Sequence, residues 1–203
     1  DTHSHYSAYN KNPEYYSPII SHLSSELDKN IQVMDVGCGD GSFLKGLISE
    51  EVNGIFIGID ISFNLLLNAK KNLDGYQNVH LIVADAFNLP FKSNEVFNLV
   101  HIDSVLHHLI DKNRSKSIRL SMELLHILMS KLKNNGLLIV EEMYYNSKGI
   151  PFITSSIIFY SLKFINFAHI DLTFIRRDLK PGLEVNFFHE RQLIRLLNKL
   201  GST

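Results

Sequence analysis

A short stretch from Val33 to Phe43 most constrains how this chain folds. It reads Val-Met-Asp-Val-Gly-Cys-Gly-Asp-Gly-Ser-Phe. The apolar residues at 31–36 predict a strand that is buried on both faces. Glycines at alternate positions from Gly37 to Gly41 then remove every Cβ from a turn, so a ligand can approach the backbone closely. A helix from about Ser42 would direct its unpaired N–H groups to the same place, which predicts a site for a nucleotide-like cofactor.

The rest of the chain alternates between apolar strands and helical patterns. Further strands are predicted at 55–60, 79–84, 97–102 and 137–140, and helices at 15–27, 41–50, 62–73, 114–133 and 189–200. The helix at 114–133 carries an apolar stripe that includes Leu132, and Asn135-Gly136 is expected to end it. This alternation predicts an α/β fold, a doubly wound and mostly parallel sheet with helices on both faces.

Aspartates end or follow three of these strands. Asp60 ends the second, Asp85 follows the third and Asp103 follows the fourth. Because ligands bind outside the carboxyl ends of the strands in such sheets, these acids are expected beside the glycine turn. A dinucleotide site would need a third glycine where Ser42 stands, and the turn instead has the spacing G-x-G-x-G after the acid Asp35.

This ordered set of motifs resembles the class I S-adenosylmethionine-dependent methyltransferases, in a small-molecule branch similar to methyltransferase type 11. The family's first motif is an acid followed by G-x-G-x-G, as at 35–41. Gly58-Ile59-Asp60 looks like its second-strand acid, and 84–91 is similar to its D-A-x-x-L-P-F segment. Residues 97–109 and 136–140 resemble its fourth and fifth strands. The match covers about residues 30–142 and implies a Rossmann-like fold.

The resemblance implies a methyltransferase (EC 2.1.1.-) that moves a methyl group from S-adenosyl-L-methionine to a small-molecule acceptor. The reaction is an in-line displacement in which the enzyme mainly holds the reactants aligned. Asp35 would hold the cofactor's ammonium group, Asp60 its ribose hydroxyls and Asp85 its adenine amino group. The predicted cofactor-binding residues are Asp35, Gly37, Cys38, Gly39, Gly41, Asp60, Ile61, Asp85, Ala86 and Asp103.

His107 and His108 are the candidate catalytic residues. One of them is a possible general base, because histidine titrates near neutral pH, and the alternative role is packing or contact with the cofactor. A zinc site that combines them with His101 is not expected, since no set of ligands has structural-zinc spacing. Cys38 is expected to be a small filler in the turn.

A single domain is expected over residues 1–203. Its predicted parts are an N-terminal arm and helix (1–30), the cofactor-binding core (31–142), an insertion that caps the substrate site (143–188) and a last helix (189–203). Aromatics of the insertion either line an apolar acceptor pocket or pack in the core or a dimer interface. The arm with His3 and His5 and the basic run 176–180 are interpreted as solvated, although the run could meet an anionic substrate. Strands six and seven of the family fold are expected to be missing or truncated.

Composition limits the partners and the compartment. The formal net charge of -1 argues against a nucleic-acid partner held by bulk charge. A single cysteine and no recognisable signal peptide suit the cytoplasm, and no stretch predicts a membrane span. A homo-oligomer is compatible with the sequence. Two alternative functions are a non-catalytic subunit that binds the cofactor and an NAD-dependent dehydrogenase.

Overall fold

The structure is a computed structural model that describes residues 13–26, 30–94, 96–146, 150–170 and 184–201. These residues form two compact units. The first takes its residues from 13–103 and 127–141, and the second from 104–126 and 142–201. The predicted N-terminal arm and the basic run 176–180 lie outside the described residues.

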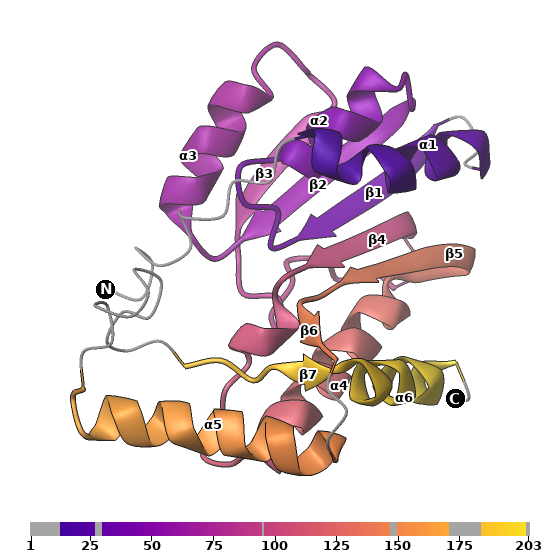
Figure 1. The fold of residues 1–203 in the computed structure, drawn as a ribbon. Coiled ribbons are helices and arrows are strands. Elements are labelled where there is room, and N and C mark those ends of the chain that lie inside the picture. The colour runs from indigo at the N-terminus through magenta and orange to yellow at the C-terminus, as the bar shows by residue number, and fades with distance from the viewer. Residues whose placement is uncertain (1–12, 27–29, 95, 147–149, 171–183, 202–203) are drawn as a thin grey trace. The chain divides into compact units, whose positions relative to one another are not determined.

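The first unit is built on a parallel sheet. Its strands are β1 (Ile31–Val36), β2 (Gly54–Asp60), β3 (Val79–Val83), β4 (Phe97–Asp103) and β5 (Leu132–Glu141). They lie side by side in the order β3-β2-β1-β4-β5 (Figure 1). The strand order reverses between β1 and β4, where ligands bind in open α/β sheets. The predicted doubly wound, Rossmann-like fold is therefore confirmed.

Helices of the first unit pack beside one another along this sheet (Figure 1). The short helix η2 (Pro13–Tyr16) leads into α1 (Ser17–Glu26), and α2 (Ser42–Ser49) follows the glycine turn. Phe43, Leu44 and Leu47 of α2 are fully buried in a core with apolar residues of β1 and β2. Ser62 caps α3 (Phe63–Asn72), accepting a hydrogen bond from the Leu65 backbone N–H at 3.4 Å.

The predicted end of the long helix is wrong. Helix α4 covers Arg114–Ser130, and Leu132 already belongs to β5. The Lys131 carbonyl accepts hydrogen bonds from the Val96 and Phe97 N–H groups, which draws the chain into the sheet. Asn135, at a φ of 65°, lies in an irregularity of β5 and does not end the helix. A side-chain stripe cannot reveal this, because long-range backbone pairing decides where the helix stops.

The second unit holds the remaining elements. They are η3 (Leu106–His108), α4 as far as His126, β6 (Tyr144–Tyr145), α5 (Pro151–Phe167), β7 (Phe188–His189) and α6 (Glu190–Leu200). Strands β6 and β7 form a separate parallel pair, so within the described residues the sheet has no sixth or seventh strand. None of the helices in the described part of the chain is long and apolar enough to cross a membrane.

Candidate cofactor site at the edge of the sheet

The glycine turn between β1 and α2 has a backbone that only glycine adopts readily. Gly37, Gly39 and Gly41 have φ angles of 73°, 55° and 79°, all in the left-handed region. The N–H groups of Gly37 and Cys38 both donate to the Ile59 carbonyl, at 2.8 and 3.0 Å. The turn is therefore held against the end of β2, where the sequence predicts the second acid.

Two of these glycines differ in what surrounds them. A Cβ at Gly41 would lie 2.5 Å from a methyl group of Leu73, so this glycine permits close packing of α2 against α3. A Cβ at Gly39 would meet no atom of the described residues within 4 Å. Gly39 therefore borders open space at the carboxyl edge of the sheet, and a bound molecule can reach its backbone there.

Asp60 ties the turn to β2 with both carboxylate oxygens. Oδ2 accepts a hydrogen bond from the Gly39 N–H at 2.9 Å, and Oδ1 accepts one from the Ser62 N–H at 2.8 Å. The sequence did not predict this structural role. A carboxylate oxygen can accept more than one hydrogen bond, so these contacts are compatible with the predicted ribose role.

The other predicted residues of this edge follow β2 and β3. Ile61 is 56% exposed, Asp85 is exposed and Ala86 is half-buried. Asp85 accepts a hydrogen bond from the Phe87 N–H at 2.9 Å, which stabilises the turn after β3. Cys38 is buried, and burial raises the pKa of its thiol well above the ordinary range. That shift disfavours a thiolate nucleophile and fits the interpretation of Cys38 as a filler.

The acid of the first motif is held in a buried network. Asp35 and His101 are paired in register on β1 and β4, and Asp35 Oδ1 lies 2.7 Å from His101 Nδ1. The other ring nitrogen, Nε2, lies 3.0 Å from Glu141 Oε2 at the end of β5. The His101 ring also stacks on Phe43, with ring centroids 3.7 Å apart. The second oxygen of Asp35, Oδ2, is buried without a hydrogen-bond partner among the described residues.

Charge explains why His101 is tolerated in the core. Burial alone would lower its pKa, but the carboxylates of Asp35 and Glu141 outweigh burial and raise the pKa of His101 to about 9. His101 is therefore an imidazolium at neutral pH. Burial also raises the pKa of Asp35, and the His101 charge opposes that rise. This network was not predicted from the sequence, although a histidine between apolar residues of a predicted strand indicates a buried partner.

Asp103 has a partner that the sequence did not suggest. Its Oδ2 accepts a hydrogen bond from the Tyr16 hydroxyl at 2.7 Å. Burial and then the charge of Asp103 raise the pKa of Tyr16, so the phenol stays protonated and acts as the donor. Tyr16 also meets the His101 ring edge-on, with centroids 5.8 Å apart. The predicted role of Asp103 in cofactor binding stays a prediction.

The predicted catalytic histidines lie in the second unit, in η3. His107 Nδ1 lies 2.6 Å from Glu142 Oε1, and both side chains are almost fully buried. Glu142 also accepts hydrogen bonds from the backbone N–H groups of His107 and Met143. Burial and then the charge of His107 lower the pKa of His108 to about 3. His107 is thus paired with a carboxylate, whereas the pKa of its neighbour His108 is lowered. The pairing with Glu142 was not predicted from the sequence.

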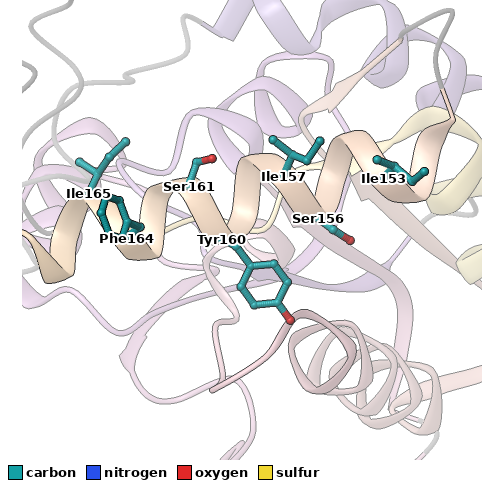
Figure 2. Close-up of a pocket in the computed structure, with 7 residues that line it drawn as sticks. All are labelled: Ile153, Ser156, Ile157, Tyr160, Ser161, Phe164 and Ile165. Carbon is teal, nitrogen blue, oxygen red and sulfur yellow. The ribbon is translucent and has the colours of Figure 1, made fainter.

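The aromatic insertion forms α5, and its side chains divide between two faces. Phe159 and Ser155 are buried, whereas Tyr160, Phe164 and Phe167 are at least half exposed. An open pocket of about 820 Å³ lies along the exposed face, and Figure 2 shows its lining residues on this one helix. They are Ile153, Ser156, Ile157, Tyr160, Ser161, Phe164 and Ile165. The insertion thus contributes both to the core and to an apolar surface.

Comparison with known proteins identifies a family match. A model of the methyltransferase domain matches residues 27–160. Malonyl-[acyl-carrier protein] O-methyltransferase of Legionella pneumophila is 33% identical over 76 residues, 37% of this chain and 26% of the relative. A tRNA (guanine-N(7)-)-methyltransferase of Prochlorococcus marinus is 26% identical over 114 residues, 53% of this chain and 54% of the relative. The chain thus spans a quarter to a half of the length of these relatives.

The fold also matches a solved structure with its cofactor bound. CalS10, an amino pentose methyltransferase from Micromonospora echinaspora, was solved with S-adenosylmethionine bound. It aligns with a TM-score of 0.54 at 16% identity, over 67% of this chain and 52% of that chain. The family and such structures support S-adenosylmethionine as the cofactor of this chain.

Proposed function

The chain belongs to the methyltransferase domain family, and on this premise we propose that it methylates a small-molecule acceptor with S-adenosylmethionine. The observation that carries the proposal is the glycine turn. Its three left-handed glycines are fixed to the end of β2 by Asp60, and Gly39 borders open space where the strand order reverses. A molecule with an amino-acid tail can approach this backbone without meeting a side chain.

The residues at this edge fit the groups of the cofactor. Asp60 is the proposed acceptor for the ribose hydroxyls, and Asp85, which is exposed, is the proposed acceptor for the adenine amino group. The buried and unpaired Oδ2 of Asp35 suits an ammonium group or a bridging water. When bound, S-adenosylmethionine supplies an activated methyl group on a positive sulfonium. The chain's task is to hold the acceptor in line with it and to exclude water.

His107 is the proposed general base for acceptors that must lose a proton. With Glu142 accepting from Nδ1–H, the basic lone pair of the ring is on Nε2, and the carboxylate stabilises the imidazolium that forms. His108 is a much weaker base, because its pKa is lowered to about 3. Glu142 acts through His107 and is a positioning residue. This contrast favours His107 over its neighbour.

A small molecule is proposed as the acceptor because of the chain's charge. Lys and Arg number 20 against 21 Asp and Glu, so counterion release from a nucleic acid would contribute little to binding. The tRNA methyltransferase among the relatives makes bulk tRNA a necessary arm of any acceptor panel. Methyl transfer to tRNA in preference to every small molecule tested would contradict this part of the proposal.

Gly39→Ala tests cofactor binding at the turn. The new methyl group has no neighbour within 4 Å in the described part of the chain, so the fold bears only the strain of a left-handed alanine, about 1–2 kcal/mol. Isothermal titration with S-adenosylmethionine should show an affinity loss of about tenfold or more, because the methyl group occupies the space that the ligand needs. Gly75→Ala is the matched control, since Gly75 also has positive φ and open surroundings.

Equal affinity in wild type, Gly39→Ala and Gly75→Ala would contradict the proposed site, and no binding by the wild type at millimolar cofactor would contradict the proposed function.

Methyl transfer should fall strongly in His107→Gln and much less in His108→Gln. Cofactor binding without methyl release to any acceptor would instead favour the non-catalytic alternative.

A further inference from the structure

Among the described residues, most of the buried side-chain polar atoms without a hydrogen-bond partner belong to three residues. Five side-chain atoms in the described part of the chain are buried without a hydrogen-bond partner. Four of them belong to Arg114, Asn186 and Gln192, all in the second unit. Buried polar groups are normally paired, because leaving one unpaired costs about 1–3 kcal/mol. This concentration therefore needs an explanation.

Arg114 is the central residue of this cluster. It lies at the start of α4 and is only 4% exposed. Its Nη2 donates to Gln192 Oε1 at 2.8 Å and to the Phe187 carbonyl at 3.5 Å, while Nε has no hydrogen-bond partner in the described part of the chain. Among the described residues no carboxylate pairs with it, and burial lowers the pKa of its guanidinium. A buried guanidinium without a counterion is costly, so the site is electrostatically suited to an anion.

Gln192 adds an amide donor beside this cation, and Asn186 adds a second amide one residue before the Phe187 carbonyl that Arg114 contacts. Gln192 Oε1 already accepts hydrogen bonds from Arg114, Ser155 Oγ and the His189 N–H, which fixes the amide, and its Nε2 has no partner within the described ranges. Asn186 is completely buried, and neither polar atom of its side-chain amide has a hydrogen-bond partner among the residues that the structure describes. Unpaired N–H donors next to an arginine are the groups that bind a carboxylate or a phosphate.

The irregular segment before β7, residues 184–187, connects this cluster to the proposed base. The Asn186 N–H donates to the His107 carbonyl at 2.8 Å, and the Phe187 ring lies parallel to the His107 ring with centroids 6.2 Å apart. The next carbonyl, that of Phe187, faces Arg114. The polar cluster around Arg114 and the proposed base His107 thus belong to one contiguous region of the second unit.

We propose that Arg114, Asn186 and Gln192 form a binding site for an oxyanion group, a carboxylate or phosphate, of the methyl acceptor. The assignment of this anion to the acceptor rests on the proposed function, whereas the anion site itself does not. With this assignment, the proposed acceptors are molecules that carry an anionic group in addition to the atom that is methylated.

The experiment measures thermal unfolding of the full chain with simple anions as probes. Sodium acetate, sodium butyrate and inorganic phosphate are compared with sodium chloride at matched ionic strength and with the uncharged acetamide and butyramide. Acetate and butyrate, or phosphate, should raise the unfolding midpoint of the wild type, and the amides should not. Whichever anion acts identifies the source of the oxyanion.

Three variants locate the effect. Arg114→Met should lose the anion-dependent shift, with an apparent affinity weaker by about tenfold or more. Arg119→Met, at an exposed position of the same helix, should keep it. Gln192→Glu places a carboxylate where Arg114 already donates, so it should raise the midpoint without added anion and diminish the response to it.

No anion-specific shift in the wild type, or an equal shift in Arg114→Met and the wild type, would overturn the proposal, leaving the cluster to buried water. If Arg114→Met fails to fold, Gln192→Glu decides the outcome alone. S-adenosylmethionine titration of the same proteins separates the two proposals: an anion shift without cofactor binding contradicts the methyltransferase function only, and cofactor binding without an anion shift contradicts the anion site only.

Discussion

Two buried cations in the described part of the chain, His101 and Arg114, differ in whether nearby carboxylates balance their charge. In the first unit, His101 lies between Asp35 and Glu141, so the chain itself supplies its counterions. In the second unit, Arg114 is as deeply buried but contacts only neutral oxygens among the described residues. Because desolvating a charge costs several kcal/mol, the first arrangement holds the fold together and the second reserves its charge for a ligand. The contrast shows that the partners of a buried cation, more than its burial, indicate its role.

The largest expected effect comes from removing the compensated cation. His101→Leu leaves the buried Asp35 and the half-buried Glu141 without the imidazolium between them, and should lower the free energy of unfolding by about 3–5 kcal/mol. Chemical denaturation at neutral pH measures this loss. His126→Leu, at an exposed position of α4, is the control and should change stability little. A loss below about 1 kcal/mol in His101→Leu would mean that the network is not an ionic one.

Titration of His101 should produce the next largest effect. Its pKa is raised in the folded chain from 6.5 to about 9, so its stabilisation is fully present below pH 6.5 and is lost as pH rises through about 9. The shift corresponds to roughly 3 kcal/mol, measured by denaturation across this range. The buried thiol of Cys38 adds alkaline destabilisation of the same sign, so the series is run in Cys38→Ala. The slope should be absent from His101→Leu in that background.

The smallest expected change in stability, that of Arg114→Met, has the opposite sign. Without any anion, Arg114→Met replaces an uncompensated buried charge with an apolar chain of similar length and should leave stability unchanged or raise it by about 1 kcal/mol. Denaturation in a buffer without carboxylate or phosphate measures it, with Arg119→Met as the reference. A loss comparable to that of His101→Leu would show that Arg114 serves the fold, and the contrast between the two cations would fail.

Much of the first unit was predictable because short stretches of sequence determine its strands and its glycine turn. Alternating apolar runs placed the five strands, and the positive φ of Gly37, Gly39 and Gly41 agrees with the reason for having glycine there. The pairing of Asp35 with His101 was not predicted, since it depends on the register of strands that lie far apart in sequence. A rule that each charged residue in an apolar strand needs a partner would have directed attention to both.

The second unit was harder to predict for a physical reason. The buried face of α4 includes Arg114, Ser117 and Ser121, whereas the predicted stripe counted only apolar residues. Ser121 satisfies its hydroxyl by donating to the Ser117 carbonyl within the helix, so burial costs it little. A search for hydrophobic periodicity does not detect such buried polar positions. It also carries no information on Asn186, whose importance lies in the hydrogen bonds that it lacks.

The strand order of the sheet also has a consequence for how the chain reaches its native state. The two central strands are far apart in sequence: the Gln32 N–H of β1 bonds to Asn98 of β4, 66 residues later. During synthesis β1 must wait for β4 with one edge unpaired, and the parallel sheet contains no hairpin that forms quickly on its own. Refolding should thus be slower than that of a helical bundle of equal length, and aggregation during this delay should limit the yield of folded protein.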